Sequence, residues 1–444
     1  MKNRFIIDNK ITNEFVEKYT KTTYRIIGPN KHSSIKPCHW LEQRLSTGRD
    51  NRNCYKGVFG IQSHRCLQNT PSLPFCNHQC VFCWRDIELG SLGSDFIVDP
   101  DDPKLLIDEM LKHHKDIIQN HLPLRRYLDN YEIMLDILYY MLLNNDRIHT
   151  VNSLVNSIHV SKNKIERAVT LLKNQEFIKF KSPSMKELSL DDDIKCCIGS
   201  REELEILVNR SLTTPDEIMQ AHNEALTPNH AAISLDGEPL LYPRISEFIQ
   251  EFTNRNMTTF VVTNGTLPEK IENLEVFPSQ LYITLPAPNE AIYKKTCRPM
   301  IKKGWNKIIA SMDLIETIPC RTLVRLTAIK DLNINEEMIN EYIKIIENAN
   351  PNFFEIKGFT LQAKALLIKQ RLKETHPVHY FFPEYEYLED LAIKFEEIGN
   401  FPLIYKNKAS RDFLFAVNWD KNKDPVLQKP EAKLQKNNSS GSLS

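Results

Sequence analysis

The sequence lacks the features of a membrane or secreted protein. No apolar run is long enough to cross a bilayer, and the start, MKNRFIIDNK, lacks the apolar core of a signal peptide. The chain also lacks a net charge, because 57 lysine and arginine residues balance 57 acidic ones. Bulk charge therefore indicates no nucleic-acid partner, which would need local basic patches. These absences predict a cytoplasmic protein.

Cysteine is concentrated in one stretch of the chain. Six of the ten cysteines lie between residues 38 and 83. Because the cytoplasm keeps thiols reduced, this group favours a metal or redox role over disulfides. The other four are scattered and are interpreted as ordinary buried or surface thiols: Cys196, Cys197, Cys297 and Cys320.

Strand and helix patterns alternate in the second half of the chain. At 444 residues the chain exceeds the usual size of one domain, which predicts one large domain plus an added module. Apolar runs typical of strands lie at 231–236, 259–264, 281–286, 322–329, 353–359 and 414–417. Helical patterns separate them at 244–254, 305–315, 336–349 and 387–398. This alternation predicts an α/β fold with a partial or closed (β/α) barrel, whose catalytic groups lie at the carboxyl ends of the strands.

Residues 124–180 interrupt this alternation. Three helical patterns are followed there by the short alternating run FIKF, an order typical of a winged helix-turn-helix. Helical patterns at 103–120 and 214–225 flank the segment, which is therefore predicted to be an insertion. The acidic run 191–193 suits an exposed connector, and the polar tail from about residue 420 predicts disorder.

Three cysteines have the spacing of an iron–sulfur loop. The pattern Cys76-x3-Cys80-x2-Cys83 places three thiolates where they can bind three irons of a cubane 4Fe-4S cluster. The fourth iron can then chelate the amino and carboxylate groups of S-adenosylmethionine, and an electron cleaves this molecule to a 5′-deoxyadenosyl radical. The alternative is a zinc knuckle that includes His78, although zinc normally takes a fourth nearby Cys or His. Phe82 fits a position near the adenine.

Residues after the following strands are candidate cofactor contacts. Gly237-Glu238-Pro239 resembles the Gly-Glu motif with which radical enzymes bind the methionine amino group. Glycine permits close backbone approach, and a carboxylate accepts hydrogen bonds from an ammonium group. Asn264 could hydrogen-bond the cofactor from the next turn, and Thr284 ends the third apolar run. Each of these residues is also compatible with ordinary turn chemistry.

Cys38, Cys54 and Cys66 lie upstream at wide spacing. Ligands from separate loops can meet in space, so these three residues are compatible with a second cluster. They are equally compatible with three unligated thiols, and spacing alone does not decide between the two interpretations.

Longer matches resemble one protein family. The segments 53–56, 59–68, 70–71 and 76–85 look like those of the 4-demethylwyosine synthases, radical S-adenosylmethionine enzymes of the tRNA wybutosine pathway. Further matches lie at 101–103, 232–235, 237–239, 241–243, 262–265 and 355–358. The likeness covers residues 30–120 and 210–420. The insertion is outside the minimal family pattern, and the flavodoxin-like domain of longer members is missing. Pro286 stands where a polar residue is expected and receives no role.

The resemblance implies a complete set of cofactors and substrates. It implies S-adenosyl-L-methionine and two 4Fe-4S clusters, the second of them on Cys38, Cys54 and Cys66. It implies pyruvate as the donor of two carbons, and as acceptor the N1-methylguanosine 3′ of the anticodon in tRNA-Phe. Lys56 matches the lysine that forms a Schiff base with pyruvate, although spacing alone would make it a surface lysine. The missing flavodoxin-like domain implies an external electron donor of the ferredoxin or flavodoxin type.

Contacts to the RNA are less specific. An unpaired anticodon-loop base can be splayed out and stacked on aromatic side chains, for which Trp84 and Arg85 beside the cysteine loop are candidates. Arginines near the barrel mouth could meet phosphates, although most arginines form surface pairs. These candidates are Arg65, Arg85, Arg298 and Arg325.

Five segments and two rival functions complete the prediction. The segments are an N-terminal extension with auxiliary-cluster ligands (1–65), the first barrel part (66–122), the inserted winged helix-turn-helix module (123–199), the second barrel part (200–420) and a disordered tail (421–444). One rival is another radical S-adenosylmethionine enzyme with an auxiliary cluster, acting on a protein or small molecule. The other is a transcription regulator that senses iron or redox state through its clusters. Lys56 discriminates, because a sensor needs no lysine beside a cluster ligand.

Overall fold

The computed structural model describes most of the chain. The described residues are 5–21, 23–47, 54–85, 87, 93–121, 124–144, 149–174, 177–180, 193–196 and 215–427. Cys197, residues 191–192 of the predicted connector and most of the predicted tail lie outside them. The chain forms two compact units. The first unit contains Met1–Pro37, Cys54–His114 and Pro228–Ser444, and the second contains Cys38–Asn53 and Lys115–Thr227. The five predicted segments stay a prediction.

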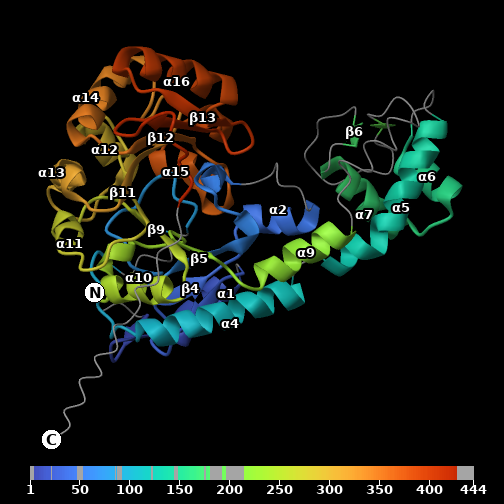
Figure 1. Ribbon diagram of the computed structural model, residues 1–444, viewed down its shortest axis with the longest axis horizontal. Coiled ribbons are helices and arrows are strands. Elements are labelled where there is room, and N and C mark those ends of the chain that lie inside the picture. The colour runs from blue at the N-terminus through green and yellow to red at the C-terminus, as the bar shows by residue number, and fades with distance from the viewer. Residues whose placement is uncertain are drawn as a thin grey trace, which may run out of the picture. The chain divides into compact units, whose positions relative to one another are not determined.

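A ten-stranded sheet, with six parallel strands at its centre, forms the first unit (Figure 1). The parallel strands, in their order in the sheet, are β5 (Cys66–Thr70), β8 (His230–Ile233), β9 (Thr258–Thr263), β10 (Gln280–Thr284), β11 (Arg321–Ala328) and β12 (Phe353–Gly358). The alternating apolar runs in the sequence correctly predicted β8 to β12. β5 was missed, because CLQNT is short and half polar.

Antiparallel strands extend the sheet on both sides. β14 (Asp412–Ala416) and β13 (Leu403–Asn407) follow β12, while β4 (Ser33–Ile35) and β3 (Arg25–Ile27) follow β5. Among the described residues β3 and β13 each pair with one strand, so the sheet is open and the closed alternative does not apply. The parallel centre and open ends give a mostly parallel α/β fold.

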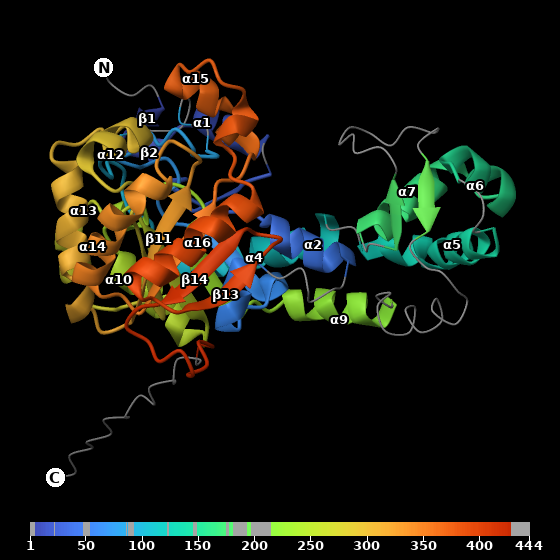
Figure 2. The ribbon, with the colours of Figure 1, turned by 90° about the horizontal axis from the view of Figure 1, so that it is seen from above.

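Amphipathic helices cover the parallel strands. α10 (Ile245–Asn254) buries Ile245, Phe248, Ile249 and Phe252, a spacing that puts all four on one helix face. Each such side chain contributes roughly 1.5–3 kcal/mol when it is fully buried. The other helices of this unit are α1 (Asn13–Thr20), α11 (Pro268–Glu272), α12 (Glu290–Cys297), α13 (Gly304–Asp313), α14 (Ile339–Ala349), α15 (Ile368–Leu372) and α16 (Tyr385–Gly399). Figure 1 shows α10, α13, α14 and α16 following one another around the strands, and Figure 2 shows α13 beside α14.

The opposite face of the sheet buries its own apolar cluster. Ala232, Phe260, Tyr282, Leu323 and Phe353 come from five adjacent strands and pack together. The segment that follows Cys54 packs onto them through Phe59 and Ile61. This packing brings the 3-10 helix η2 (Tyr55–Phe59) into the interior of the sheet. A short hairpin of β1 (Ile6–Ile7) and β2 (Lys10–Ile11) precedes α1.

The second unit contains the segment predicted to be an insertion. Its described elements are α2 (His39–Thr47), α5 (Leu124–Leu143), α6 (Val151–Ile158), α7 (Lys162–Asn174), β6 (Ile178–Phe180), β7 (Ile194–Cys196) and α9 (Pro215–Ala225). The helices and first strand follow the predicted order, and β7 pairs antiparallel with β6. The Thr150 hydroxyl caps α6 by accepting a hydrogen bond from the amide of Ser153, and the Ser153 hydroxyl accepts one from the amide of Thr150, which completes a capping box.

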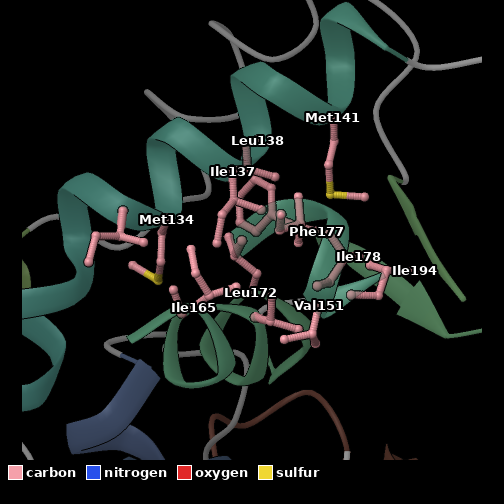
Figure 3. Packing of buried hydrophobic residues seen from close by; sticks show 14 of the residues in the cluster. Met134, Ile137, Leu138, Met141, Val151, Ile165, Leu172, Phe177, Ile178 and Ile194 are labelled. Carbon is pink, nitrogen blue, oxygen red and sulfur yellow. The ribbon is translucent and has the colours of Figure 1, made fainter. Parts of the chain in front are cut away.

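This unit has a hydrophobic core of its own. Side chains from α5, α6, α7 and both strands meet in one cluster (Figure 3). Met134, Ile137, Leu138 and Met141 are among the residues that α5 contributes, at helical spacing. A second, smaller cluster joins α2 and α9 to Ile118 at the end of α4 (Pro103–His121), the helix in which the chain passes from the first unit to the second. No described helix is both long and apolar enough to cross a membrane.

Candidate active site

The predicted cluster loop lies directly after β5, and the end of α12 fixes its backbone. The amides of Gln79 and Val81 donate to the carbonyls of Cys297 and Thr296, over 3.0 and 2.9 Å. The amide of Cys83 donates to the carbonyl of Cys80 over 3.1 Å. The local spacing of the cysteines is therefore supported by contacts with a helix more than two hundred residues away in the sequence.

All three cysteines of the loop line one cavity of about 210 Å³. Five of the six predicted contacts to S-adenosylmethionine line the same cavity: Phe82, Gly237, Glu238, Asn264 and Thr284. Pro239 is not among the lining residues and instead begins the buried turn Pro239–Leu241. The loop and these residues come from the carboxyl ends of β5, β8, β9 and β10, where the barrel rule places catalytic groups.

The thiols of this loop are held in a buried environment. Burial raises the pKa of Cys76 to about 12 and that of Cys83 to about 11, while the nearby Arg85 guanidinium lowers both. A hydrogen bond with Cys297, followed by burial, raises the pKa of Cys80 well above its usual value. The pKa values of these thiols stay high despite Arg85, so more positive charge is needed to stabilise their thiolate forms. Cationic irons supply that charge, so this donor set fits an iron–sulfur cluster.

Cys297 is a residue that the sequence did not single out. Its thiol lies with Cys80 and His78 in a group whose ligand atoms are within 4.8 Å of one another, and it lines the same cavity. His78 also shares a 2.7 Å hydrogen bond between its Nε2 and the Tyr293 hydroxyl. The interpretation of Cys297 as an ordinary thiol therefore missed its place beside the loop. No local pattern marks it, because 217 positions separate it from Cys80.

Glu238 is oriented by donors from two neighbouring segments. Its Oε1 accepts from the Thr263 hydroxyl over 2.7 Å, and its Oε2 accepts from the Asn264 amide over 2.8 Å. Burial raises the pKa of Glu238, and the hydrogen bonds from Asn264 and Thr263 lower it. The Asn264 side chain in turn donates to Asn77 in the cysteine loop over 2.7 Å. A continuous hydrogen-bond chain therefore joins the predicted cofactor contacts to the cluster loop.

The close approach of two loops explains why residue 237, in the Gly-Glu motif, is a glycine. Gly237 has φ +73°, and a Cβ there would lie 2.1 Å from the carbonyl oxygen of Ser72. The amide of Glu238 also donates to the carbonyl of Phe75 over 2.8 Å. Glycine is required here because the two loops pass so closely.

Two arginines support the cysteine loop from inside the protein. Arg85 is 3% exposed, and its Nε lies 3.2 Å from Oδ1 of Asp236. The other carboxylate oxygen of Asp236, Oδ2, accepts a hydrogen bond from the Tyr24 hydroxyl. This burial makes Arg85 a support of the loop, and the predicted phosphate contact is wrong for it. Arg371 of α15 donates to the loop carbonyls of Val81, Cys83 and Arg85.

Lys56 is also buried, and the surface-lysine interpretation is wrong. The side chain is 4% exposed, and its Nζ lies 5.1 Å from the centre of the Phe260 ring and 5.8 Å from that of Tyr282. Burial lowers its pKa, while Tyr55, Cys66 and Cys54 raise it, and the net direction is upward. The amine therefore lies against aromatic side chains on the inner face of the sheet.

The three upstream cysteines fall in different units. Cys54 and Cys66 are buried in the first unit, 7% exposed each, at the start of η2 and of β5. Cys38 belongs to the second unit, where it precedes α2 and packs against the small cluster that holds α2 and α9. The triad itself stays a prediction.

Comparisons with known proteins identify the family of this chain. The model of the radical SAM superfamily matches residues 196–373. The S-adenosyl-L-methionine-dependent tRNA 4-demethylwyosine synthase of Pyrococcus horikoshii is 32% identical over 350 residues, which cover 78% of this chain and 74% of that protein. The protein of the same name from Methanocaldococcus jannaschii is 27% identical over 406 residues, 90% of this chain and 95% of its own.

Solved structures show the same fold. One is described as TYW1 with a lysine-pyruvate adduct bound; it has a TM-score of 0.59 and 24% identity and covers 94% of this chain and 99% of its own. Another is archaeal TYW1, with a TM-score of 0.55 and 23% identity over 94% of this chain. With the 32% identity to the Pyrococcus protein, these observations exclude the redox-sensing regulator. The chain belongs to the S-adenosyl-L-methionine-dependent tRNA 4-demethylwyosine synthases, a family of radical S-adenosylmethionine enzymes.

Proposed function

We propose that this enzyme condenses pyruvate with the N1-methylguanosine 3′ of the anticodon in tRNA-Phe, in the cytoplasm, to form the tricyclic base 4-demethylwyosine. The observation that carries the proposal is the burial of Lys56 on the interior face of the sheet, against Phe260 and Tyr282. A lysine in an apolar interior is suited to imine chemistry with a ketone. Membership of the family supports the identity of the product.

The cavity after β5 is the proposed cofactor site. Cys76, Cys80 and Cys83 would hold a 4Fe-4S cluster, and Phe82, Gly237, Glu238, Asn264 and Thr284 would surround S-adenosyl-L-methionine. Pro239 would act from the turn behind Glu238. When bound, the pair supplies a carbon radical that removes a hydrogen atom from the N-methyl group of the substrate base. The chain contributes a rigid frame: Glu238 is held by Thr263 and Asn264, ready to accept from an ammonium group.

Lys56 is the proposed covalent residue. Its neutral amine attacks the ketone carbon of pyruvate, the ketone oxygen leaves as water, and an imine remains. The aromatic rings around the amine exclude bulk water, which favours the imine over its hydrolysis. The methylene radical of the base then adds to the imine carbon, and the carboxyl group leaves with the odd electron, which restores the imine. The exocyclic amine of the guanine attacks the same carbon and displaces the Lys56 amine, and loss of a proton completes the ring.

Cys38, Cys54 and Cys66 are the proposed ligands of a second 4Fe-4S cluster. The burial of Cys54 and Cys66 in the unit that also contains Lys56 supports this proposal. We include an external electron donor of the ferredoxin or flavodoxin type as the proposed source of the electrons that reduce the clusters.

The second unit is the proposed RNA-binding module, a winged helix-turn-helix inserted into the barrel. Three helices followed by a strand pair support the class. The third helix, α7, exposes Lys162, Lys164, Arg167 and Lys173 to solvent. In such modules this helix commonly contacts nucleic acid, and contacts to phosphates do not depend on the base sequence.

Anaerobic turnover with carbon-labelled pyruvate tests the proposal. Reduced enzyme, S-adenosylmethionine and tRNA-Phe carrying N1-methylguanosine should give labelled 4-demethylwyosine after nuclease digestion. The same tRNA with unmethylated guanosine is the matched control and should give none. Cleavage of S-adenosylmethionine without label in the base would favour the rival enzyme with a protein or small-molecule substrate.

A further inference from the structure

Arg325 is a buried arginine that the proposed chemistry leaves without a role. It lies in β11, in register with Thr284 on one side and Glu355 on the other. The residue is 7% exposed and lines the cavity that also contains the three loop cysteines. Its suggested contact with an RNA phosphate is wrong for a side chain inside the sheet.

The guanidinium of Arg325 is only partly satisfied. Its Nε donates to Glu355 Oε2, and its Nη1 lies 3.4 Å from the Tyr55 hydroxyl. Its Nη2 is buried and has no hydrogen-bond partner among the described residues. The hydroxyl of Tyr282 is also buried and has no hydrogen-bond partner among the described residues. Buried donors are normally paired, so two open donors at one place indicate a missing acceptor.

The two open donors lie beside the proposed covalent lysine. The guanidinium carbon of Arg325 is 4.5 Å from the centre of the Tyr282 ring and 4.6 Å from that of Tyr55. The Nζ of Lys56 lies over the same rings, at 5.8 and 5.6 Å. The amine and the guanidinium are therefore neighbours, and Glu355 offsets the charge of Arg325.

We propose that Nη2 of Arg325 binds the carboxylate of the 2-oxo acid while Lys56 forms the imine at its ketone carbon. The inference rests on the proposed function, because it assumes that Lys56 reacts with pyruvate. In a 2-oxo acid the carboxylate is bonded directly to the ketone carbon, so a neighbouring guanidinium can bind the carboxylate while the lysine amine reacts at the ketone carbon. A guanidinium donates charge-assisted hydrogen bonds to a carboxylate, and Tyr282 can add a neutral one. Arg325 thus selects a 2-oxo acid over a plain ketone.

Arg321 provides a matched control on the same strand. It lies four residues earlier, on the same side of β11, and its Nη2 is also buried without a partner among the described residues. Its guanidinium contacts Phe59, Phe353 and Trp419 at the other end of the strand. It does not line the cavity of the cysteines, so its loss should leave ketone selectivity unchanged.

Borohydride trapping on the reconstituted full-length protein tests the inference. Pyruvate and hydroxyacetone, which lacks the carboxylate, are titrated separately, and mass spectrometry quantifies each reduced adduct on the Lys56 peptide. Wild type and Arg321→Gln should prefer pyruvate. Arg325→Gln should raise the half-saturating pyruvate concentration about tenfold or more and leave hydroxyacetone trapping unchanged.

A second variant guards against misfolding. Arg325→Gln leaves Glu355 buried and unpaired, so the double variant Arg325→Gln/Glu355→Gln removes both charges and should show the same loss of preference. Retained preference for pyruvate in either variant would overturn the inference and leave the proposed function intact. Weaker binding of S-adenosylmethionine with unchanged ketone preference would overturn it too. Absence of any Lys56 adduct in the wild type would overturn the proposed function and this inference together.

Discussion

The Nη1 of Arg371 lies 2.6 Å from the backbone carbonyl oxygen of Cys83, to which it donates a hydrogen bond. The same guanidinium reaches the carbonyls of Val81 and Arg85. A hydrogen bond from a charged group contributes about 1.5–3 kcal/mol, and 1.4 kcal/mol is a tenfold change in an equilibrium. We therefore expect Arg371→Gln to hold iron in the cysteine loop about tenfold less tightly.

Competition with a chelator measures this effect. Lys369→Gln, which removes a cation from the same helix, is the control and should retain iron as the wild type does. Equal iron retention by Arg371→Gln would mean that the loop keeps its shape without the three carbonyl contacts.

Replacing Cys76, Cys80 and Cys83 by alanine should abolish reductive cleavage of S-adenosylmethionine. Roughly half of the bound iron should remain, because the second set of cysteines would still hold its own cluster. Iron analysis and chromatography of the cleavage products provide the measurement. Full cleavage activity in the triple variant would make the assignment of this loop untenable, and complete loss of iron would argue against a separate second cluster.

Lys56→Ala should lose product formation and pyruvate trapping. Because the net pKa of Lys56 lies above its ordinary value, the neutral amine is scarce near neutral pH. Its population rises with pH, so the initial rate of trapping in the wild type should rise between pH 7 and 9. Rate measurements at fixed pyruvate check this sign. Product formation by Lys56→Ala at the wild-type rate would remove the covalent role.

Charge removal on α7 should weaken tRNA binding without changing radical generation. Lys162, Lys164 and Arg167 are exposed, and a change of all three to glutamine removes three cations that could release counterions from the RNA. The slope of binding affinity against salt should fall by about two to three. Filter binding at several salt concentrations measures the slope. An unchanged affinity would indicate that this face contacts protein or solvent.

His32 should make the first unit sensitive to acid. Its Nδ1 lies 2.6 Å from the Pro71 carbonyl, and its Nε2 accepts from the amide of Asp101 over 2.9 Å, which defines a neutral ring. Burial lowers its pKa to about 4. The unfolded chain therefore binds a proton that the folded chain does not, and stability is lost as pH falls from the unfolded pKa toward 4.

Asp101 acts in the opposite direction. Burial raises its pKa to about 6, so the folded chain gains stability as pH falls through that value. The two groups offset each other in the wild type. The destabilisation caused by His32→Gln should then shrink by up to roughly 3 kcal/mol between pH 7 and 4. Urea unfolding at several pH values tests this, with His379→Gln, at an exposed site, as the control.

The sequence predicted those parts of the fold whose signals are local. β8 to β12 are runs of apolar residues, and Cys76, Cys80 and Cys83 have a ligand spacing within eight residues. β4 was missed because its Ser33 and Ser34 are polar yet buried, so no alternation marks it. Tertiary pairing with β5 decides its structure.

The supporting residues of the site could not be predicted from local signals. Arg371 acts on a carbonyl 288 positions away, and Cys297 meets Cys80 only through the packing of α12 against the loop. The sequence indicated Arg325 only as one of four arginines that could meet phosphates. Its pairing register in β11 places it in the interior. Such residues bind backbone or ligand atoms that leave no pattern in the surrounding sequence.

The small cluster at the base of the second unit has an evolutionary consequence. Ile118, on the helix that enters this unit, packs with Ala221 and Ala225, on the helix that leaves it. Entry and exit are therefore adjacent, so one recombination event can add or remove the segment between α4 and α9 without breaking a strand of the large sheet. A short loop joining α4 to α9 would restore a continuous chain after removal of this segment. The same junction would accept the segment in a relative that lacks it.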